Sequence, residues 1–299
     1  MASNIATRPS LIEASGRRQR RRRTSSLFVG LTAAATVLAL VPLLLIISYV
    51  VVQGFQALSI DFFTQTFKPV TIGTASTGSG GVLHAIVGSL LIVSVALAMA
   101  VPIGVMAGIY LSEYPGTSAS NVIRFSTDVL TAMPSIVVGV VAYVLIVQRA
   151  NQFSAVAGSI ALMVLMVPVV TRTTEEILRL VPGAVREAAI ALGVPKWRFT
   201  LNVVIPMGLS GIVTGILLAF ARAMGETAPL LVTVLGNNNL TWDIFGPMQA
   251  LPLIAYRYTE QPFAVLNQQA WGAALILVTI VLAANVLVRL ATRRTTRSR

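Results

Sequence analysis

The chain has 299 residues, of which 56% are hydrophobic and only 11% are charged, and its net charge is +12. Soluble domains average about 45–50% apolar and about 25% charged residues, so this composition excludes an ordinary soluble domain and indicates lipid as the solvent. The chain has no cysteine and a single histidine, His84. Disulfides, thiolate chemistry and metal sites built on Cys or on several His side chains are therefore excluded.

The two ends of the chain are polar and basic. Residues 1–26 include a run of arginines from Arg17 to Arg23, and we expect them to form a disordered cytoplasmic tail that contacts anionic lipid. Residues 293–299 are expected to form a second basic cytoplasmic tail. The chain between the tails, residues 27–292, is predicted to be one membrane-spanning domain.

Six segments have the length and apolar content of a membrane-spanning helix, which needs about 20 residues. In chain order they are 27–52, 82–111, 122–147, 153–171, 207–235 and 270–290. Polar segments over 53–81 and 236–269 are predicted on one side of the membrane, and a polar loop over 172–206 on the other. The predicted fold class is an all-α integral membrane protein with about six transmembrane helices.

The distribution of positive charge predicts the orientation of these spans, because cytoplasmic loops and tails are enriched in Lys and Arg. Most of the 22 Lys and Arg residues fall in the two tails and the 172–206 loop, whereas the segments assigned to the outside hold Lys68, Arg149 and Arg257. Both termini are therefore predicted in the cytoplasm. Because the basic residues lie at span ends and in tails, the net charge does not indicate a nucleic-acid partner.

The third predicted span carries Asp128 near the cytoplasmic face, with Arg124 four residues before it. One interpretation is an interfacial ion pair between these two side chains. The other is a role for Asp128 in an inner gate, together with Pro134 and Ser135. Pro134 is expected to break the helix and free backbone carbonyls, which membrane proteins tolerate only against protein or a cavity.

The 172–206 loop is predicted to fold as short amphipathic helices beneath the membrane. Apolar side chains recur at helical spacing through 177–181 and again through 185–192. Gly193 suits a helix C-terminus with positive φ, and Pro195 suits the first turn of the next helix. Spacing alone leaves open an ordinary amphipathic loop that is stabilised by membrane contact.

The fifth predicted span contains two charged side chains, Arg222 and Glu226, in an apolar segment. Their i, i+4 spacing places them on one face of a continuous helix, where they can pair. A charge at the bilayer centre costs about 2.5–3.5 kcal/mol on insertion scales, so the pair indicates a functional pathway. The guanidinium of Arg222 can bind two oxygens of an oxyanion at once. A purely structural ion pair between helices is the alternative.

The long internal loop resembles the EAA signature of ABC importer permeases, which reads E-A-A-x3-G-x9-I-x-L-P. The matching residues are Glu187, Ala188, Ala189, Gly193, Val203, Ile205 and Pro206, with Val203 and Ile205 at the two aliphatic positions of the signature. The resemblance implies the type I permease fold of ABC importers. It also implies that Glu187, Ala188, Ala189 and Gly193 belong to a coupling loop that docks in a cleft of a cytoplasmic ATPase.

Two other segments resemble the phosphate-specific PstA branch of these permeases. Residues 128–139 are similar to its D-x-L-x-x-x-P-S-I-V-x-G segment and residues 225–230 to its G-E-T-A-P segment, and the external residues 246–252 also resemble that branch. This resemblance extends over residues 27–290. It implies that the chain translocates inorganic phosphate across the cytoplasmic membrane, with Arg222, Glu226 and Thr227 along the pathway.

The resemblance also implies partner subunits. These are a homologous second permease of the PstC type, two ATPase subunits of the PstB type, and a periplasmic or lipid-anchored phosphate-binding protein of the PstS type. The chain has no G-x-x-x-x-G-K-[ST] phosphate loop. We therefore expect it to be a transport subunit, not an enzyme, and to bind no cofactor itself, with ATP and Mg on the partner ATPase.

Three alternatives differ in the sequence features that they require. A permease for sulfate or molybdate fits the EAA loop equally well, but residues 225–230 argue against it. A secondary carrier or channel needs paired half-helices or an inverted repeat, and neither is visible in the sequence. A membrane enzyme needs a cluster of catalytic groups, which this sequence does not offer.

Overall fold

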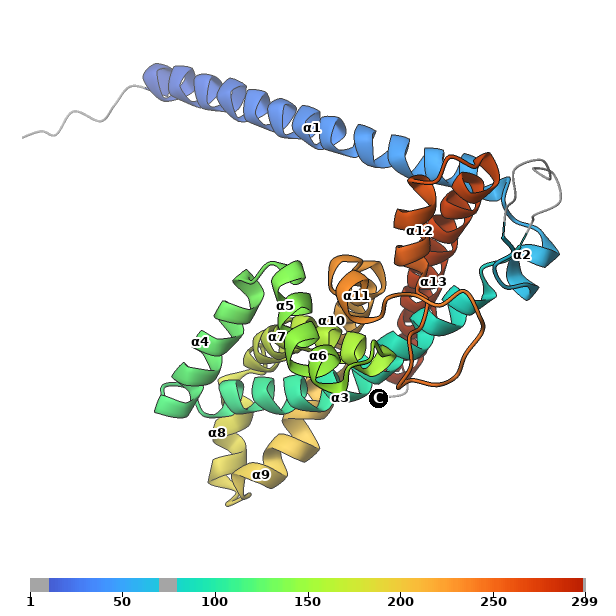
Figure 1. The fold of residues 1–299 in the computed structure, drawn as a ribbon. Coiled ribbons are helices and arrows are strands. Elements are labelled where there is room, and N and C mark those ends of the chain that lie inside the picture. The colour runs from blue at the N-terminus through green and yellow to red at the C-terminus, as the bar shows by residue number, and fades with distance from the viewer. Residues whose placement is uncertain (1–10, 70–79, 298–299) are drawn as a thin grey trace, which may run out of the picture. The chain divides into compact units, whose positions relative to one another are not determined.

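The computed structural model describes residues 11–69 and 80–297, and the regular elements in these residues are helices (Figure 1). In chain order they are α1 Leu11–Phe55, α2 Ile60–Thr64, α3 Leu83–Glu113, α4 Ser118–Ala132, α5 Ser135–Ala142, the π-helix η1 Tyr143–Val147, α6 Gln148–Ala150, α7 Ala155–Arg179, α8 Gly183–Ala191, α9 Lys196–Phe199, the π-helix η2 Thr200–Val204, α10 Ile205–Gly225, α11 Ala228–Thr233, α12 Leu251–Thr259 and α13 Ala264–Arg297.

Five stretches of helix among the described residues are long and apolar enough to cross a membrane. They are Thr24–Phe55, Leu83–Glu113, Ala155–Arg179, Lys196–Gly225 and Ala264–Leu290. A bent pair of helices, Ser118–Ala132 and Ser135–Ala150, provides a sixth crossing if the pair is counted as one span. The prediction of an all-α membrane protein with about six spans is therefore confirmed.

The third predicted span, 122–147, is not one continuous helix. α4 ends at Ala132, α5 begins at Ser135, and the two segments are bent by 102°. Pro134 stands between them with φ −59° and ψ 134°, and its carbonyl accepts the backbone N–H of Val137 at 3.0 Å. The sequence predicted a helix break at Pro134, because proline lacks an N–H and disfavours a helical conformation of the preceding residue, and the break is present.

The fifth predicted span, 207–235, is also interrupted. α10 ends at Gly225, Glu226 has an extended conformation with ψ 120°, and α11 begins at Ala228. Pro229 is the second residue of α11, a position that suits proline because the N–H groups of a first helical turn have no partner inside the helix. The prediction that Arg222 and Glu226 share a face of one continuous helix is therefore wrong.

Both predicted tails are helical where the structure describes them. α1 begins at Leu11, although the sequence predicted disorder over 1–26, and α13 continues to Arg297, into the predicted tail 293–299. Arg and Gln are good helix formers, so the residues around Arg17–Arg23 extend the adjoining span. Residues 1–10 lie outside the described residues. The boundaries of the predicted membrane domain, 27–292, stay a prediction.

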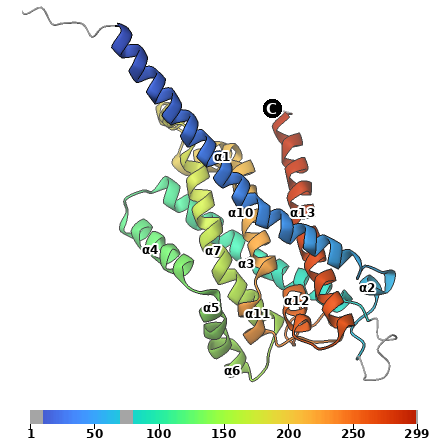
Figure 2. The same cartoon turned by 90° about the horizontal axis from the view of Figure 1, so that it is seen from above.

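The core of the part after α1 is built on the packing of α3 against α7. Small residues on α3 allow this close approach: a Cβ at Gly104 would lie 2.7 Å from the Cβ of Val170, and Gly108 lies against Thr174. Ser159 donates a hydrogen bond to the Ile92 carbonyl across the same interface at 2.9 Å. α7 also packs against α10 and against the bent α4–α5 pair, beside which it runs in Figure 2. α7 therefore joins the elements that carry the candidate sites.

Candidate functional site

Arg222 and Glu226 flank the end of α10. Arg222 is in the last turn of that helix, and its Nε lies 3.5 Å from Oε1 of Glu226. The Arg222 side chain is 46% exposed in the isolated chain, whereas that of Glu226 is 17% exposed. The two charges therefore pair as predicted, although they do so at a break in the helix and not in its middle.

The backbone around this break is irregular. Glu226 donates its backbone N–H to the Ala223 carbonyl at 3.2 Å, and the carbonyl of Thr227 accepts the N–H of Leu231 at 3.0 Å. Thr227 precedes the first residue of α11 and is half-buried. Membrane proteins tolerate a broken helix where it contacts protein or lines a polar cavity, so a charged pair at this break is suited to a translocation pathway.

The two interrupted spans meet. Gly139 of α5 lies against Pro229 of α11, since a Cβ added to Gly139 would be 2.6 Å from the Pro229 Cα. α11 also packs on α7, where a Cβ added to Gly158 would be 3.0 Å from Leu230. The half-helices that follow the two breaks therefore pack on each other, and the two segments that resemble PstA permeases in sequence are in contact.

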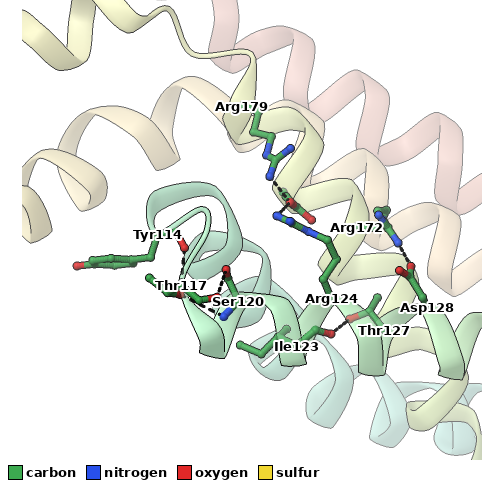
Figure 3. A network of polar contacts seen from close by, with 10 residues as sticks. Tyr114, Thr117, Ser120, Ile123, Arg124, Thr127, Asp128, Arg172 and Arg179 are labelled. Atoms are coloured by element: carbon green, nitrogen blue, oxygen red, sulfur yellow. Dashed lines mark hydrogen bonds and ion pairs between the residues drawn. The ribbon is translucent and has the colours of Figure 1, made fainter.

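Ion pairs tie α4 to α7 (Figure 3). Glu175, whose side chain is 4% exposed, accepts from Arg124 at 2.6 Å and from Arg179 at 2.7 Å. Arg172 of α7 donates to Asp128 of α4. The prediction of an Arg124–Asp128 pair is therefore wrong. Both side chains find partners on α7, because a buried carboxylate such as Glu175 must be paired with a cation.

The three residues assigned to an inner gate lie on one side of the bend or at it. Asp128 is in α4 with a side chain that is 56% exposed, Pro134 is at the bend, and Ser135 is the half-buried first residue of α5. Thr117 caps the start of α4 by accepting the Ser120 N–H at 3.2 Å (Figure 3). α4 is thus a short helix fixed at its start by a cap, along its length by ion pairs and at its end by proline.

The coupling-loop residues lie on and after α8, and α8 and α9 are the short helices that the sequence predicted. Ala189 is buried, whereas Glu187 and Ala188 are exposed. Gly193 has φ +66°, which confirms the predicted helix end with positive φ. A Cβ at Gly193 would meet no atom within 4 Å, so the backbone conformation and not packing within this chain requires glycine there.

The loop also exposes large apolar side chains. Leu180 is 76% exposed, Ile190 75% and Leu192 81%. Exposed apolar side chains gathered on one short segment are typical of a docking surface for another protein. Ile190 is in α8, whereas Leu180 and Leu192 are the residues directly after α7 and α8.

Sequence reasoning missed two buried acidic residues that join neighbouring helices by ion pairs, Glu113 and Glu175. Glu113 is the last residue of α3, and its buried Oε1 accepts from Nη1 of Arg186 in α8 at 2.5 Å. A signal was present, because both belong to a set of only ten acidic residues and stand at the ends of apolar segments. A buried acidic residue in such a chain requires a cation, but the sequence alone does not say which one.

The structure is that of a helical membrane protein. Its two broken spans are in contact, a charged pair lies at one break, and the loop after α7 exposes two short helices. Residues 100–297 match the family of binding-protein-dependent transport system inner membrane components. The phosphate transport system permease protein PstA of Haemophilus influenzae is 40% identical over 271 residues, which are 90% of this chain and 94% of that protein. PstA of Mycobacterium leprae is 44% identical over 252 residues, or 83% of this chain and 82% of that protein.

Solved structures give the same fold. An inward-facing MetNI methionine ABC transporter matches with a TM-score of 0.56 and 20% identity, over 70% of this chain and 95% of that one. An amino acid ABC transporter with histidines matches with a TM-score of 0.55 and 20% identity, over 71% and 92%. The chain therefore belongs to the binding-protein-dependent transport system inner membrane components, within their PstA permease branch.

Proposed function

We propose that this chain is the transmembrane permease subunit of an ATP-driven ABC importer and that it translocates inorganic phosphate across the cytoplasmic membrane. The main support is the identity of 40% to the Haemophilus influenzae PstA over nine tenths of the chain. The packing of Gly139 on Pro229 adds to it, because it joins the two segments that resemble the phosphate-specific permeases. A permease for another oxyanion has no comparable support.

Arg222, Glu226 and Thr227 are proposed to line the substrate pathway. Phosphate carries one to two negative charges near neutral pH, and a guanidinium can replace part of the hydration that the ion loses on leaving water. Glu226 lies 3.5 Å from Arg222 and holds its side chain while the pathway is empty. A passing phosphate competes for the same guanidinium, so the pair opens as the ion arrives.

The energy is proposed to come from separate ATPase subunits of the PstB type, on which ATP and Mg are bound. The exposed face of the loop, with Glu187, Ala188 and Ile190, docks on that ATPase, and Gly193 shapes its end. A PstC-type permease completes the pathway, and a PstS-type protein delivers phosphate from outside. The bend at Pro134, with Asp128 and Ser135, is proposed as the inner gate. Both termini face the cytoplasm.

Reconstitution of the complex tests this function. The chain is co-expressed with the ATPase, the second permease and the binding protein that are encoded with it, and ATP-dependent uptake of radiolabelled phosphate into proteoliposomes is measured. We expect uptake that needs ATP and the binding protein, and that excess sulfate or molybdate does not reduce. Uptake of sulfate or molybdate without phosphate would contradict the proposal.

A further inference from the structure

The coupling loop is attached to the spans at the Glu113 carboxylate. Arg186, in α8, donates from Nη1 to Oε1 of Glu113 at 2.5 Å and from Nη2 to the Leu178 carbonyl at 3.1 Å. Glu113 ends α3 and Leu178 is in the last turn of α7. One side chain of the loop therefore holds the cytoplasmic ends of the two helices that pack most extensively on each other.

A second cation of the loop reaches the same end of α3. Lys196, the first residue of α9, donates to the backbone carbonyl of Glu113, and its Nζ lies 3.9 Å from the centre of the Tyr114 ring. Arg186 and Lys196 stand on the two sides of Gly193, which ends the first of the two short helices. Both arms of the coupling loop are thus attached to the last residue of α3, Glu113.

Beneath these contacts is a cavity that leaves room for movement. Its volume is about 660 Å³, and Glu113, Arg186 and Lys196 are among the residues that line it. Oε2 of Glu113 and Oγ of Ser112 are buried without a hydrogen-bond partner among the described residues. Since an unpaired buried acceptor is costly, Oε2 is a ready alternative acceptor for Arg186 or Lys196 when the loop shifts. The contact between Arg186 and Glu113 therefore has two arrangements available, one on Oε1 and one on Oε2.

We propose that Glu113 is the positioning residue through which movement of the coupling loop enters the membrane spans. This role rests on the proposed function, and it concerns a residue outside the EAA segment. When the partner ATPase moves α8, the Arg186–Glu113 pair carries the displacement to α3 and α7. It passes from α7 to α4 through the pairs of Glu175 with Arg124 and of Asp128 with Arg172.

Removing the charge of Glu113 tests the proposal with little change of shape. In a Glu113→Gln complex, Arg186 keeps a neutral acceptor but loses its ionic partner. We expect ATP hydrolysis within about twofold of the wild type and a fall of about tenfold or more in phosphate transported per ATP, since coupling between sites is commonly worth 5–150-fold. The charge swap Glu113→Arg with Arg186→Glu should restore much of that ratio. Glu260→Gln is the matched control, because it makes the same change at an exposed acidic residue directly after α12, outside the coupling loop.

A second measurement separates this proposal from the identity of the transported ion. A single cysteine is placed at Ile123 on α4 of the Cys-free chain, where the side chain is half-buried. ATP binding to the complex should change the rate at which a thiol reagent labels it, and Glu113→Gln should abolish the change. If the wild type takes up no phosphate, the proposed function fails, while this labelling still tests the role of Glu113.

Three outcomes would overturn the proposal. The first is a Glu113→Gln complex with the wild-type ratio of phosphate to ATP and the wild-type labelling change. The second is a parallel loss of hydrolysis and transport that the swap does not repair, which would assign the pair to loop folding alone. The third is failure of both the single variant and the swap to assemble, which would also assign the pair to loop folding alone.

Discussion

Gly139 of α5 packs directly on Pro229 of α11, with no room for a side chain between them. Gly139 lies in the helix that follows the bend at Pro134, and Pro229 lies in the first turn of the helix that follows the break after Gly225. The two half-helices that follow the breaks are therefore packed against each other. Because packed interfaces deform little, a displacement of one half-helix displaces the other.

Enlarging Gly139 should damage this contact. A Cβ there would lie 2.6 Å from the Pro229 Cα and 2.9 Å from Cγ2 of Val232, and Pro229 offers backbone that cannot rotate away. We expect Gly139→Ala to cost about 1–3 kcal/mol of stability through overpacking, with a parallel fall in phosphate uptake. Thermal unfolding in detergent and uptake into proteoliposomes measure the two effects. Gly30→Ala, where a Cβ would meet no atom within 4 Å, is the control and should be neutral.

The sequence predicted the spans, the inner loop and the break at Pro134, because hydropathy and proline act locally. It did not predict that Gly139 meets Pro229, since nothing local says which half-helices pack together. It paired Arg124 with Asp128 because helix spacing was the only geometry available. In the structure Arg124 pairs with Glu175 and Asp128 pairs with Arg172, both on α7. These contacts depend on how the helices pack, and the buried Glu175 requires a cation. The break after Gly225 was not predicted, because a proline in an apolar run does not by itself mark a break: α3 and α7 continue through Pro102 and Pro168.

Gly193 should tolerate only residues that adopt positive φ. Its φ of +66° lies in the left-handed region, which costs an ordinary residue roughly 1–2 kcal/mol and a β-branched one more. Gly193→Val should therefore uncouple ATP hydrolysis from phosphate uptake while membrane insertion persists. Gly193→Asn, which tolerates this conformation, should keep most of the uptake. Equal uptake by the Val and Asn variants would show that the shape of the loop end does not matter.

The two carboxylates that link α4 to α7 should differ in their contribution to stability. Glu175 is buried, whereas its partners Arg124 and Arg179 are 30% and 48% exposed, so Glu175→Ala removes two charge-assisted contacts without leaving a buried cation and should cost about 1.5–3 kcal/mol. Asp128 and Arg172 are about half exposed, so Asp128→Ala should cost about 0–1 kcal/mol. Thermal unfolding of the two variants in detergent gives the comparison. A greater loss from Asp128 would contradict the burial argument.

The charge distribution predicts which surfaces face the cytoplasm. Single cysteines at Ser76, Arg198 and Asn238 sample two predicted external segments and the inner loop of this Cys-free chain. A membrane-impermeant thiol reagent applied to whole cells should label positions 76 and 238 and should leave position 198 unmodified until the membrane is opened. Labelling of 198 in intact cells would reverse the orientation and place the coupling loop outside.

Arg222 and Glu226 distinguish a transport role from a structural one. If Arg222 attracts the ion in transit, Arg222→Gln should reduce phosphate uptake at least tenfold while the complex still assembles, in the range expected for loss of a charge-assisted contact. Arg222→Lys should restore only part of it, because lysine keeps the charge and loses the fork that binds two oxygens.

Glu226→Gln leaves the guanidinium without its carboxylate at 3.5 Å, so the ion is held too long or the arginine is misplaced, and uptake should fall without loss of assembly. A purely structural pair predicts the reverse: either single change weakens assembly, and the swap Arg222→Glu with Glu226→Arg restores both assembly and uptake. The Arg222 side chain is 46% exposed in the isolated chain, so this chain alone does not enclose its guanidinium. Wild-type uptake by an assembled Arg222→Gln complex would remove this arginine from the pathway.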